Sequence, residues 1–468
     1  MTIKPTAPGS GLDIPAQDAL AFAYQYGYPL ISYGRFSKKH RNTPNNTLIH
    51  ERELIKAGWT SVVRPNNDTL YTFAFCDLSQ GDLCFEAPVF DHRYWAFSFY
   101  DLYGNNYANI GSQAADKSGK YLLRYTKEGT TFGVSRDGVG QYMGCIDSPT
   151  PYGLFLARVA VEHTEADTKV VNNFQDEMKV SPVQRPSGSF APPFDRSIFD
   201  KVAASQSGPV SEVEQVLRLT ALLAPLNPPE VVQDRGWVAT MLEKAGLKNG
   251  QFVQPPHTSL TDAVAAANMA PLALRSTAGF TRYLGNNWRS PSPLISGDFR
   301  SFYAARHFVA TRGYLQPTAD QSAYPSWYPE EGFPEPGKME TTIGPKQAIL
   351  FSFSSKPKLK NTGFWSLTLY GPDTLLVANR LDRYSLGDRS DLRYPDGVSL
   401  KDREDGRFEV IVQPDDVVPP KRYENNWLPA PAGGGPISFT LRLFAPADQM
   451  FDGSYEYPKV TVIDAITE

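Results

Sequence analysis

The sequence predicts a β-rich α+β protein with two antiparallel sandwich-like or jelly-roll-like units joined by a helical middle region. Its 468 residues include 39 prolines and 36 glycines, and 12% are aromatic, which favours many short strands and turns over a helical bundle. Alternating apolar and polar residues occur in two separate stretches, and apolar residues at helical spacing lie between them. A chain of this length is expected to form two or three domains.

Residues 1–57 are expected to form an N-terminal extension that contains one helix. Leu20, Ala23 and Tyr24 follow helical spacing. A Gly-Tyr-Pro sequence begins at Gly27 and is expected to end this helix, because glycine favours the C-terminal cap and proline cannot continue a helix.

Residues 58–180 are expected to form the first β unit. Residue types alternate with a period of two in 71–76 and in 95–100, as side chains do on the two faces of a strand. Further strand-like runs occupy 121–125 and 152–161. Together these runs predict an antiparallel sheet region.

Residues 181–339 are expected to be mainly helical. Ser211 and Glu214 have the spacing of a capping box ahead of an apolar run. A second helix is expected over 237–245 and a third over 261–284.

Residues 340–468 are expected to form the second β unit. Its strand-like runs are 348–353, 364–370, 408–413 and 438–444. Short strands punctuated by Pro, Asp and Gly are typical of sandwich or jelly-roll domains.

Composition restricts the partners and the location of the protein. The net charge of −4 argues against a nucleic-acid binder, which would need a basic surface. No run of roughly 18 apolar residues is present, so no membrane-spanning helix is expected. The N-terminus lacks the charged and then apolar order of a secretory signal, and we expect a cytoplasmic protein. The expected partner is a small-molecule substrate, bound by either a monomer or a homodimer.

Sequence motifs for cofactors and metals are missing. The chain has no Gly-x-Ser-x-Gly elbow, no Walker A loop and no His-Glu-x-x-His motif. None of its six histidines lies at a metal-ligand spacing from another, and its three cysteines do not form a disulfide framework. We therefore expect neither a cofactor nor a metal.

The densest group of polar side chains precedes the first alternating run. Arg64 could bind a carboxylate or an enolate, Asp68 could act as a general base, and Tyr71 could donate a proton. Asn66 and Asn67 could polarise a carbonyl group. The structural alternative is a turn held by local side-chain hydrogen bonds, with Arg64 and Asp68 as a buried pair.

A second polar group follows the run 95–100. If the two runs are neighbouring strands, Tyr103 and Asn106 would approach the corner formed by Arg64 and Asp68. In that arrangement Asp68 would be the base, with Tyr71 or Tyr103 as the acid. Arg64 and Asn106 would then stabilise an anion.

The C-terminal half contains a third polar group and several large aromatic residues. Arg383 and Tyr384 are candidates for substrate binding, whereas Asp388 and Arg389 are expected to form structural pairs. Three tryptophans could serve as aromatic platforms for a ligand or belong to the core: Trp95, Trp365 and Trp427.

These residues resemble two protein domains of unknown function. The runs that resemble the DUF1254 domain are 64–71, 101–106 and 111–112. The runs that resemble the DUF1214 domain are 363–370, 383–389, 396–397, 426–431, 441–446 and 452–453. The resemblance implies a DUF1254 sandwich-like unit, a helical middle and a DUF1214 jelly-roll-like unit. Fungal members accompany natural-product biosynthesis genes, so the resemblance also implies a biosynthetic role.

Three functions are compatible with the sequence. The first is a cofactor-independent cyclase, isomerase or lyase that transfers protons on a small, partly apolar molecule. The second is a non-catalytic protein that binds a carbohydrate or a hydrophobic metabolite. The third is a glycan hydrolase or lyase that uses Asp68 and Asp101 as paired carboxylates.

Overall fold

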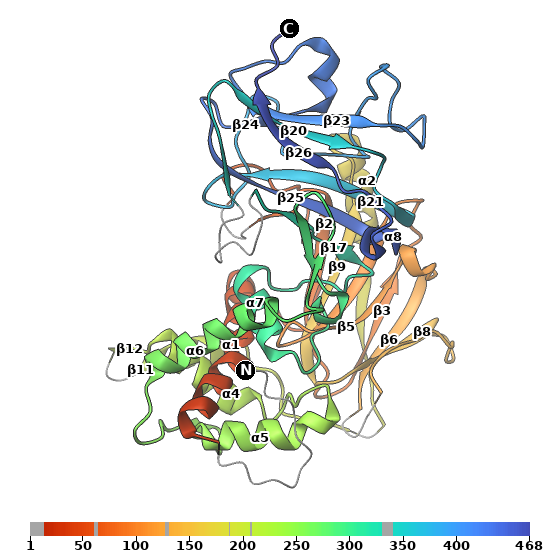
Figure 1. Cartoon of the computed structure of the whole chain (residues 1–468). Helices are drawn as coiled ribbons and strands as arrows, with labels where there is room; N and C mark the ends of the chain where they lie inside the picture. Colours follow the sequence, from red (N-terminus) through yellow and green to blue (C-terminus); the bar gives the residue numbers. More distant parts are fainter. Residues whose placement is uncertain (1–13, 60–63, 127–130, 187, 206–207, 330–339) are drawn as a thin grey trace.

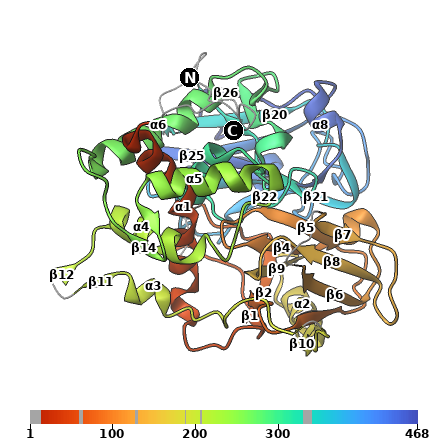
Figure 2. The ribbon, with the colours of Figure 1, turned by 90° about the horizontal axis from the view of Figure 1, so that it is seen from below.

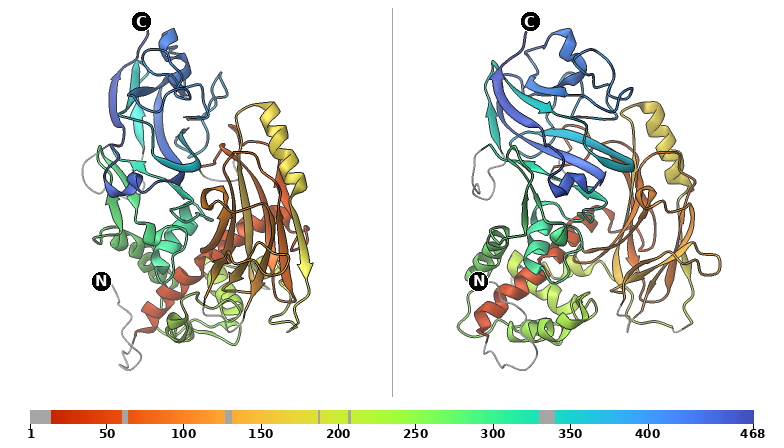
Figure 3. Two further views of the ribbon diagram at one scale, coloured as in Figure 1. Left: turned by 90° about the vertical axis from the view of Figure 1, so that its right-hand side faces the viewer. Right: turned by 45° about the vertical axis from the view of Figure 1, so that its right-hand side comes forward.

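The computed structural model describes residues 14–59, 64–126, 131–186, 188–205, 208–329 and 340–468. The chain folds into two β units and a helical region (Figure 1). The C-terminal β unit lies at the top of this view, the first β unit at the lower right and the helices at the lower left, and the two views of Figure 3 show the same arrangement. The predicted β-rich α+β fold class is confirmed.

The first β unit consists of two five-stranded sheets that enclose an apolar core. The first sheet has the order β1 (Ile49–Glu51), β2 (Thr69–Asp77), β9 (Tyr152–Ala160), β4 (Trp95–Asp101) and β5 (Asn106–Gly111). The second has the order β10 (Lys179–Val183), β3 (Asp82–Ala87), β6 (Gly119–Tyr125), β8 (Gly144–Ser148) and β7 (Gly133–Ser135). Helix α2 (Glu165–Glu177) lies along the outside of this unit (Figure 3). All strand pairs in the two sheets are antiparallel except β6 with β8.

The helical region is built around α1 (Ala16–Ser37), which contacts four other helices. These are α4 (Glu212–Leu223), α5 (Arg235–Lys244), α6 (Leu260–Arg275) and α7 (Tyr303–Arg312). Figure 2 shows them gathered beside the strands of both β units. Short elements complete the region: α3 (Ile198–Lys201), β11 (Ala204–Ser205), β12 (Gly208–Pro209), β13 (Leu247–Lys248), β14 (Gln251–Phe252), β15 (Thr281–Tyr283), β16 (Trp288–Pro291) and β18 (Ser326–Trp327). No helix in the described ranges is long and apolar enough to cross a membrane.

Two helix ends differ from the prediction. Helix α1 continues beyond Gly27 and Pro29 to Ser37, because the residues after Gly27 are buried against the other helices and the first sheet. Gly27 is used for close packing instead of for termination, since a Cβ atom there would lie 1.7 Å from the side-chain oxygen of Thr220 on α4. Helix α6 ends at Arg275, well before the predicted end at residue 284. The predicted cap of α4 is confirmed, because Ser211 Oγ accepts a hydrogen bond from the Glu214 amide.

The second β unit also contains two sheets with an apolar core between them. One has the order β17 (Ser322–Ala323), β25 (Gly435–Pro446), β21 (Leu359–Tyr370) and β22 (Ser385–Gly387), and β19 (Thr341–Ile343) also pairs with β25. The other has the order β24 (Trp427–Ala430), β23 (Phe408–Pro414), β20 (Gln347–Phe353) and β26 (Lys459–Asp464). The short helix α8 (Gln449–Asp452) follows β25.

The edges of the units differ from the predicted domain limits. Strand β10 crosses the predicted limit at residue 180 and pairs with β3, so the first unit extends to Val183. Strand β17 pairs with β25 although residues 322 and 323 were placed in the helical region. Hydrogen bonding between strands that lie far apart in sequence decides these edges, and sequence composition does not reveal it.

Candidate functional site

One face of the sheet that contains β21 and β25 is polar. Ser366, Thr368 and Tyr370 alternate along β21 with Leu367 and Leu369, which lie in the apolar core. Their register partners on β25 are also polar side chains: Arg442, Thr440 and Ser438. Because successive side chains on a strand point to opposite faces, these six residues share the face that is directed away from the core.

The first sheet also has polar side chains on its outer face. Arg158 on β9 is paired in register with Tyr71 on β2, and it donates a hydrogen bond to Ser98 Oγ on β4 at 3.3 Å. Farther along the same face, Phe73 and Phe75 pack against the helical region. Tyr71, Arg158 and Ser98 are therefore left to face the second β unit.

The two polar faces meet in a group of side chains that we call the polar layer. Its members are Arg64, Asn66, Asp68, Tyr71, Ser98, Tyr100, Arg158, Tyr324, Ser366, Thr368, Tyr370, Arg389 and Arg442. The segment that precedes β2 crosses this junction, since Tyr370 and Arg442 both donate hydrogen bonds to the carbonyl oxygen of Pro65, at 2.9 and 3.2 Å. The first and the third polar group of the sequence, which includes Arg389, are therefore brought together in space.

Asp68 is the centre of the contact between the two β units. Its side chain is fully buried, forms an ion pair with Arg389 and accepts a hydrogen bond from Ser366 Oγ at 2.6 Å. Burial alone would raise the pKa of Asp68, but Arg389, Arg442 and the Ser366 hydrogen bond outweigh burial and hold that pKa below its ordinary value. The predicted pair between Arg64 and Asp68 is wrong, because Arg64 instead donates to Ser438 and Thr440.

The carboxyl group of Asp388 lies near this ion pair, but its pKa is shifted in the opposite direction from that of Asp68. Burial raises the pKa of Asp388 to about 6, and the charge of Arg389 offsets only part of this effect. Its Oδ1 atom accepts a hydrogen bond from the Trp365 amide at 3.3 Å. Arg389 thus forms a structural pair, as expected, and its carboxylate partner is Asp68.

The raised pKa of Asp388 predicts a pH-dependent effect of Asp388→Asn on stability. Between the ordinary value of 3.8 and about 6, the folded protein holds more protons at this position than the unfolded chain, so stability falls as the pH rises through that window. Asparagine keeps the acceptor for Trp365 and carries no charge. We expect the variant to be more stable than the wild type at pH 8, by up to about 3 kcal/mol, and the difference to shrink towards pH 4. Urea unfolding at both values checks this, and a difference that does not change with pH would contradict it.

Two buried arginines lie in the polar layer with neutral hydrogen-bond partners. Arg158 donates to Ser98, Tyr100 and the carbonyl oxygen of Leu315. Arg442 donates to Thr368 and Tyr370 and to the carbonyl oxygens of Arg64 and Pro65. Within the described part of the chain, neither guanidinium forms an ion pair with a carboxylate. Burying a charge in this way is costly unless a counter-charge is supplied.

The polar layer carries an excess of positive charge. Its four arginines outnumber the two neighbouring carboxyl groups, those of Asp68 and Asp388. Five members of the layer are only partly buried: Arg64, Asn66, Tyr71, Tyr324 and Arg389. The hydroxyl of Tyr71 accepts a hydrogen bond from Asn66 at 2.9 Å, and that of Tyr324 accepts one from Ser322 at 2.8 Å. Both hydroxyl groups keep their own protons available for donation.

Tyr103 and Asn106 do not join this layer, so the predicted convergence is wrong. Strands β2 and β4 both pair antiparallel with β9 and therefore run in the same direction. The segment before β2 and the segment after β4 consequently lie at opposite ends of the sheet. Tyr103 instead packs against Tyr26 and donates a hydrogen bond to the Asn227 carbonyl, and Asn106 binds the carbonyl oxygens of Phe99 and Ala108.

The same geometry excludes Asp68 and Asp101 as paired carboxylates. Asp101 is level with Gly153 and hence with Cys76, eight positions along β2 from Asp68. At about 3.3 Å per residue the separation is roughly 26 Å, whereas glycosidase carboxylates lie about 5–9.5 Å apart.

The three candidate tryptophans are core residues, so their use as ligand platforms is not supported. Trp95 is 4% exposed and stacks on Phe90, and Trp365 is 1% exposed beside Phe353. Trp427 is 3% exposed and donates to the Gln413 carbonyl. Side chains this deeply buried cannot present a face to a sugar.

The remaining candidate residues make local contacts. Arg383 donates to the carbonyl oxygens of Glu424 and Trp427, and Tyr384 donates to Asp382. Asn66 Oδ1 accepts from the Asp68 amide, which forms the turn that the structural alternative predicted. Asn67 is buried, and its carbonyl oxygen is 3.0 Å from His163 Nε2. None of the groups of His, Cys, Asp and Glu in the described residues is arranged to hold a metal ion.

Arg158 and Arg442 were not identified as candidate site residues, although the sequence contains a signal for both. Each is the single charged residue of its strand, in Leu-Ala-Arg-Val-Ala and Thr-Leu-Arg-Leu-Phe. A charged residue at the centre of a buried strand is unfavourable unless it has a defined partner. Tyr324 gives no comparable signal, because it lies in a loop rich in aromatic and polar residues.

The fold and the polar layer define a β-rich two-unit protein with a polar junction between the units. Residues 45–182 match the family described as "Protein of unknown function (DUF1254)", and residues 342–448 match "Protein of unknown function (DUF1214)". The chain therefore belongs to the DUF1254/DUF1214 domain-containing proteins. Most of the polar layer comes from these two matched regions, while Tyr324 comes from the segment between them.

Two solved structures resemble the whole chain. The VPA0106 protein from Vibrio parahaemolyticus is 18% identical, with a TM-score of 0.62 over 96% of this chain and 100% of that chain. A putative uncharacterized protein from Burkholderia cenocepacia is 11% identical, with a TM-score of 0.43 over 97% of this chain and 91% of that chain. The first likeness shows the fold. No curated protein matches the sequence.

Proposed function

We propose that the protein is a cofactor-independent enzyme that catalyses proton transfer on a small, partly apolar molecule, as cyclases, isomerases and lyases do, at the polar layer. One observation carries this proposal: two buried arginines without a carboxylate ion pair lie close to two tyrosines, Tyr71 and Tyr324, whose side chains are only partly buried. Such an arrangement would stabilise an oxyanion or enolate as it forms, because fixed positive charge in a site of low dielectric requires no reorganisation during the reaction.

Each residue has a defined role in this proposal. Arg158 lies 5.8 Å from the centre of the Tyr71 ring and stabilises the developing anion together with Arg442. The proton that leaves the C–H bond passes to solvent water, and Tyr71 protonates the resulting anion. Tyr324 supplies a second hydroxyl that interacts with the charges of Arg158 and Arg442. Asp68 acts as a positioning residue through Arg389 and Ser366 rather than as a base, since a base would first have to leave its ion pair.

Solvent deuterium exchange into small oxo acids tests the proposal. Each probe in a panel from pyruvate to phenylpyruvate combines a carboxylate with an acidic C–H bond, and phenylpyruvate adds an apolar ring. We expect the wild type to accelerate exchange of at least one probe in D₂O, measured by NMR, and Tyr71→Phe to slow that exchange by about 10²–10⁴-fold. Tyr283→Phe, at a residue that is 63% exposed, is the matched control and should exchange at the wild-type rate.

The same experiment separates catalysis from simple binding. If a probe shifts the thermal midpoint of the wild type but exchanges no faster than in buffer, the protein binds the anion without reacting, and the enzyme proposal is wrong. Equal exchange by Tyr71→Phe and the wild type would also contradict the role given to Tyr71.

A further inference from the structure

A separate cavity of about 730 Å³ lies where α3, α4 and β14 meet the segment 192–195. Its volume falls within the range of about 300–1,000 Å³ that is typical of small-molecule sites. Tyr152 and Arg158 lie on the same face of β9, but six residues or roughly 20 Å separate them. Phe73 and Phe75 pack against α1 on that face of the sheet. The cavity is thus distinct from the polar layer.

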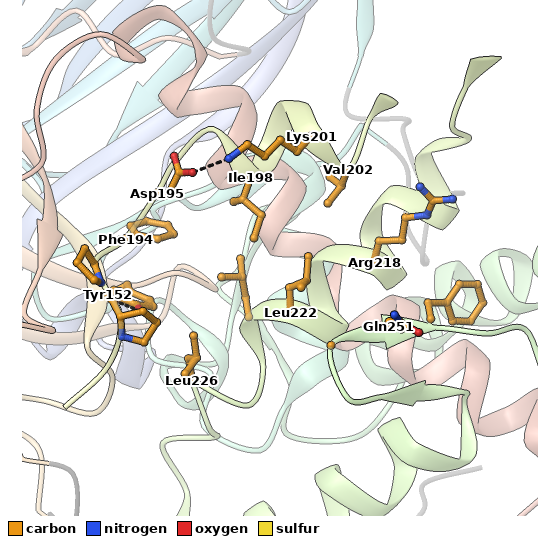
Figure 4. A pocket seen from close by; sticks show the side chains of 15 residues that line it. Tyr152, Phe194, Asp195, Ile198, Lys201, Val202, Arg218, Leu222, Leu226 and Gln251 are labelled. Atoms are coloured by element: carbon orange, nitrogen blue, oxygen red, sulfur yellow. Dashed lines mark hydrogen bonds and ion pairs between the residues drawn. The ribbon is translucent and has the colours of Figure 1, made fainter. Parts of the chain in front are cut away.

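The cavity has an apolar body. Figure 4 shows Tyr152 and Phe194 on one side and Leu222 and Leu226 between them and the opposite end. The rings of Tyr152 and Phe194 are stacked, with centroids 4.6 Å apart at an interplanar angle of 15°. Leu222 lines the cavity while 38% of its surface is exposed. An exposed leucine beside a stacked aromatic pair provides apolar surface that a ligand could cover.

One end of the cavity is polar and cationic. Arg218 and Gln251 lie at the end opposite Tyr152 (Figure 4). The charged residues in the lining are Arg218, Lys201 and Asp195, which gives the lining a net positive charge. Lys201 is paired with Asp195 at 2.7 Å, whereas the carboxylate partner of Arg218 is Glu214, which is not part of the lining. The ion pair between Arg218 and Glu214 is half-exposed, and an exposed pair of this helical spacing is weak.

We propose that this cavity binds an amphipathic carboxylate, with its apolar chain along Phe194, Leu222 and Leu226 and its carboxylate at Arg218. The planar guanidinium can bind a carboxylate through two parallel hydrogen bonds. The amide of Gln251 supplies a further donor beside it. Charge complementarity therefore favours an anionic head group over a neutral or cationic one.

Isothermal titration with three probes tests this inference on the full chain: dodecanoate below its micelle concentration, dodecyltrimethylammonium and butyrate. We expect dodecanoate to bind once per chain. Butyrate should bind at least about 100-fold more weakly, because it lacks eight methylene groups. The cationic probe should bind at least about tenfold more weakly, because its head group is repelled by Arg218. Equal binding of the anionic and cationic probes, or no binding of dodecanoate, would overturn the inference.

Variants locate the site. Leu222→Asp places a carboxylate in the apolar lining at an exposed position, so it should preserve folding and weaken dodecanoate binding by at least about tenfold. Val253→Asp is the matched control, because Val253 is 68% exposed and lies outside the lining. Arg218→Gln should weaken dodecanoate binding about five- to tenfold and strengthen binding of the cationic probe, because the repelling charge is removed. Equal effects of Leu222→Asp and Val253→Asp would show that the probe binds elsewhere.

Discussion

Arg389→Ala is expected to lower the free energy of unfolding by about 3–5 kcal/mol. The substitution leaves the carboxylate of Asp68 fully buried without its ion-pair partner. It also removes hydrogen bonds of 2.7 and 2.6 Å to the carbonyl oxygens of Asp68 and Val161. Breaking a buried pair from one side is costly, because the remaining charge cannot regain its hydration.

Denaturant unfolding followed by two spectroscopic probes measures this loss and shows whether the transition is cooperative. Arg403→Ala is the control, since its ion pair with Asp396 is exposed to solvent and should contribute little to stability. The pKa of Asp68 is lowered in the folded protein, so the stabilisation is present above the ordinary value of 3.8 and is lost as the pH falls through the folded pKa. The difference between Arg389→Ala and the wild type should therefore narrow at low pH. A loss equal to that of Arg403→Ala would show that the pair does not hold the units together.

The sequence predicted the strands well where residue types alternate along the chain. The alternating run at 71–76 lies within β2, and the run at 438–444 lies within β25. The end of α1 was missed, because its continuation past Gly27 depends on contact with Thr220 of α4. Tertiary packing thus overcame a local signal for helix termination.

The candidate site was predicted only in part. The segment from Arg64 to Tyr71 does lie in the polar layer, but the partner of Asp68 is Arg389, which is 321 positions away in the sequence. Tyr103 and Asn106 were placed incorrectly because sequence order does not show that β9 lies between β2 and β4. The spatial order of strands and pairing across two domains are tertiary properties, and residue spacing alone carries neither.

The contact between the two units also changes how the family signatures are interpreted. Asp68 comes from the DUF1254 region, and Ser366, Arg389 and Arg442 come from the DUF1214 region. The two regions thus share one buried electrostatic network. The DUF1214 region supplies the arginines that neutralise the carboxylate of Asp68 in the DUF1254 region. We infer that the two domains stabilise each other, because the DUF1254 region alone would leave the buried carboxylate of Asp68 without its ion-pair partner.

Arg158→Met is expected to separate stability from function. Methionine has a similar length and no charge, so it fills the space between Ser98 and Tyr100 without burying a guanidinium. Replacing a buried charge by an apolar residue of similar volume is often neutral or stabilising by about 1–4 kcal/mol. Exchange into the oxo-acid probes should nevertheless fall by about 10²–10³-fold, the typical effect of losing one donor to a developing oxyanion.

The matched variant for this comparison is Arg442→Met. Arg442 donates to the carbonyl oxygens of Arg64 and Pro65 and interacts with Asp68, so its removal should lower stability as well as exchange. Thermal unfolding and deuterium exchange measured on the same preparations give both quantities. If Arg158→Met lost several kcal/mol of stability, Arg158 would be a structural residue. Its charge could then no longer be assigned to stabilising the anion, and the proposed chemistry would lose its main support. We expect Arg158→Met to be at least as stable as the wild type and to lose deuterium exchange, as is typical of a buried charge that serves function at the expense of stability.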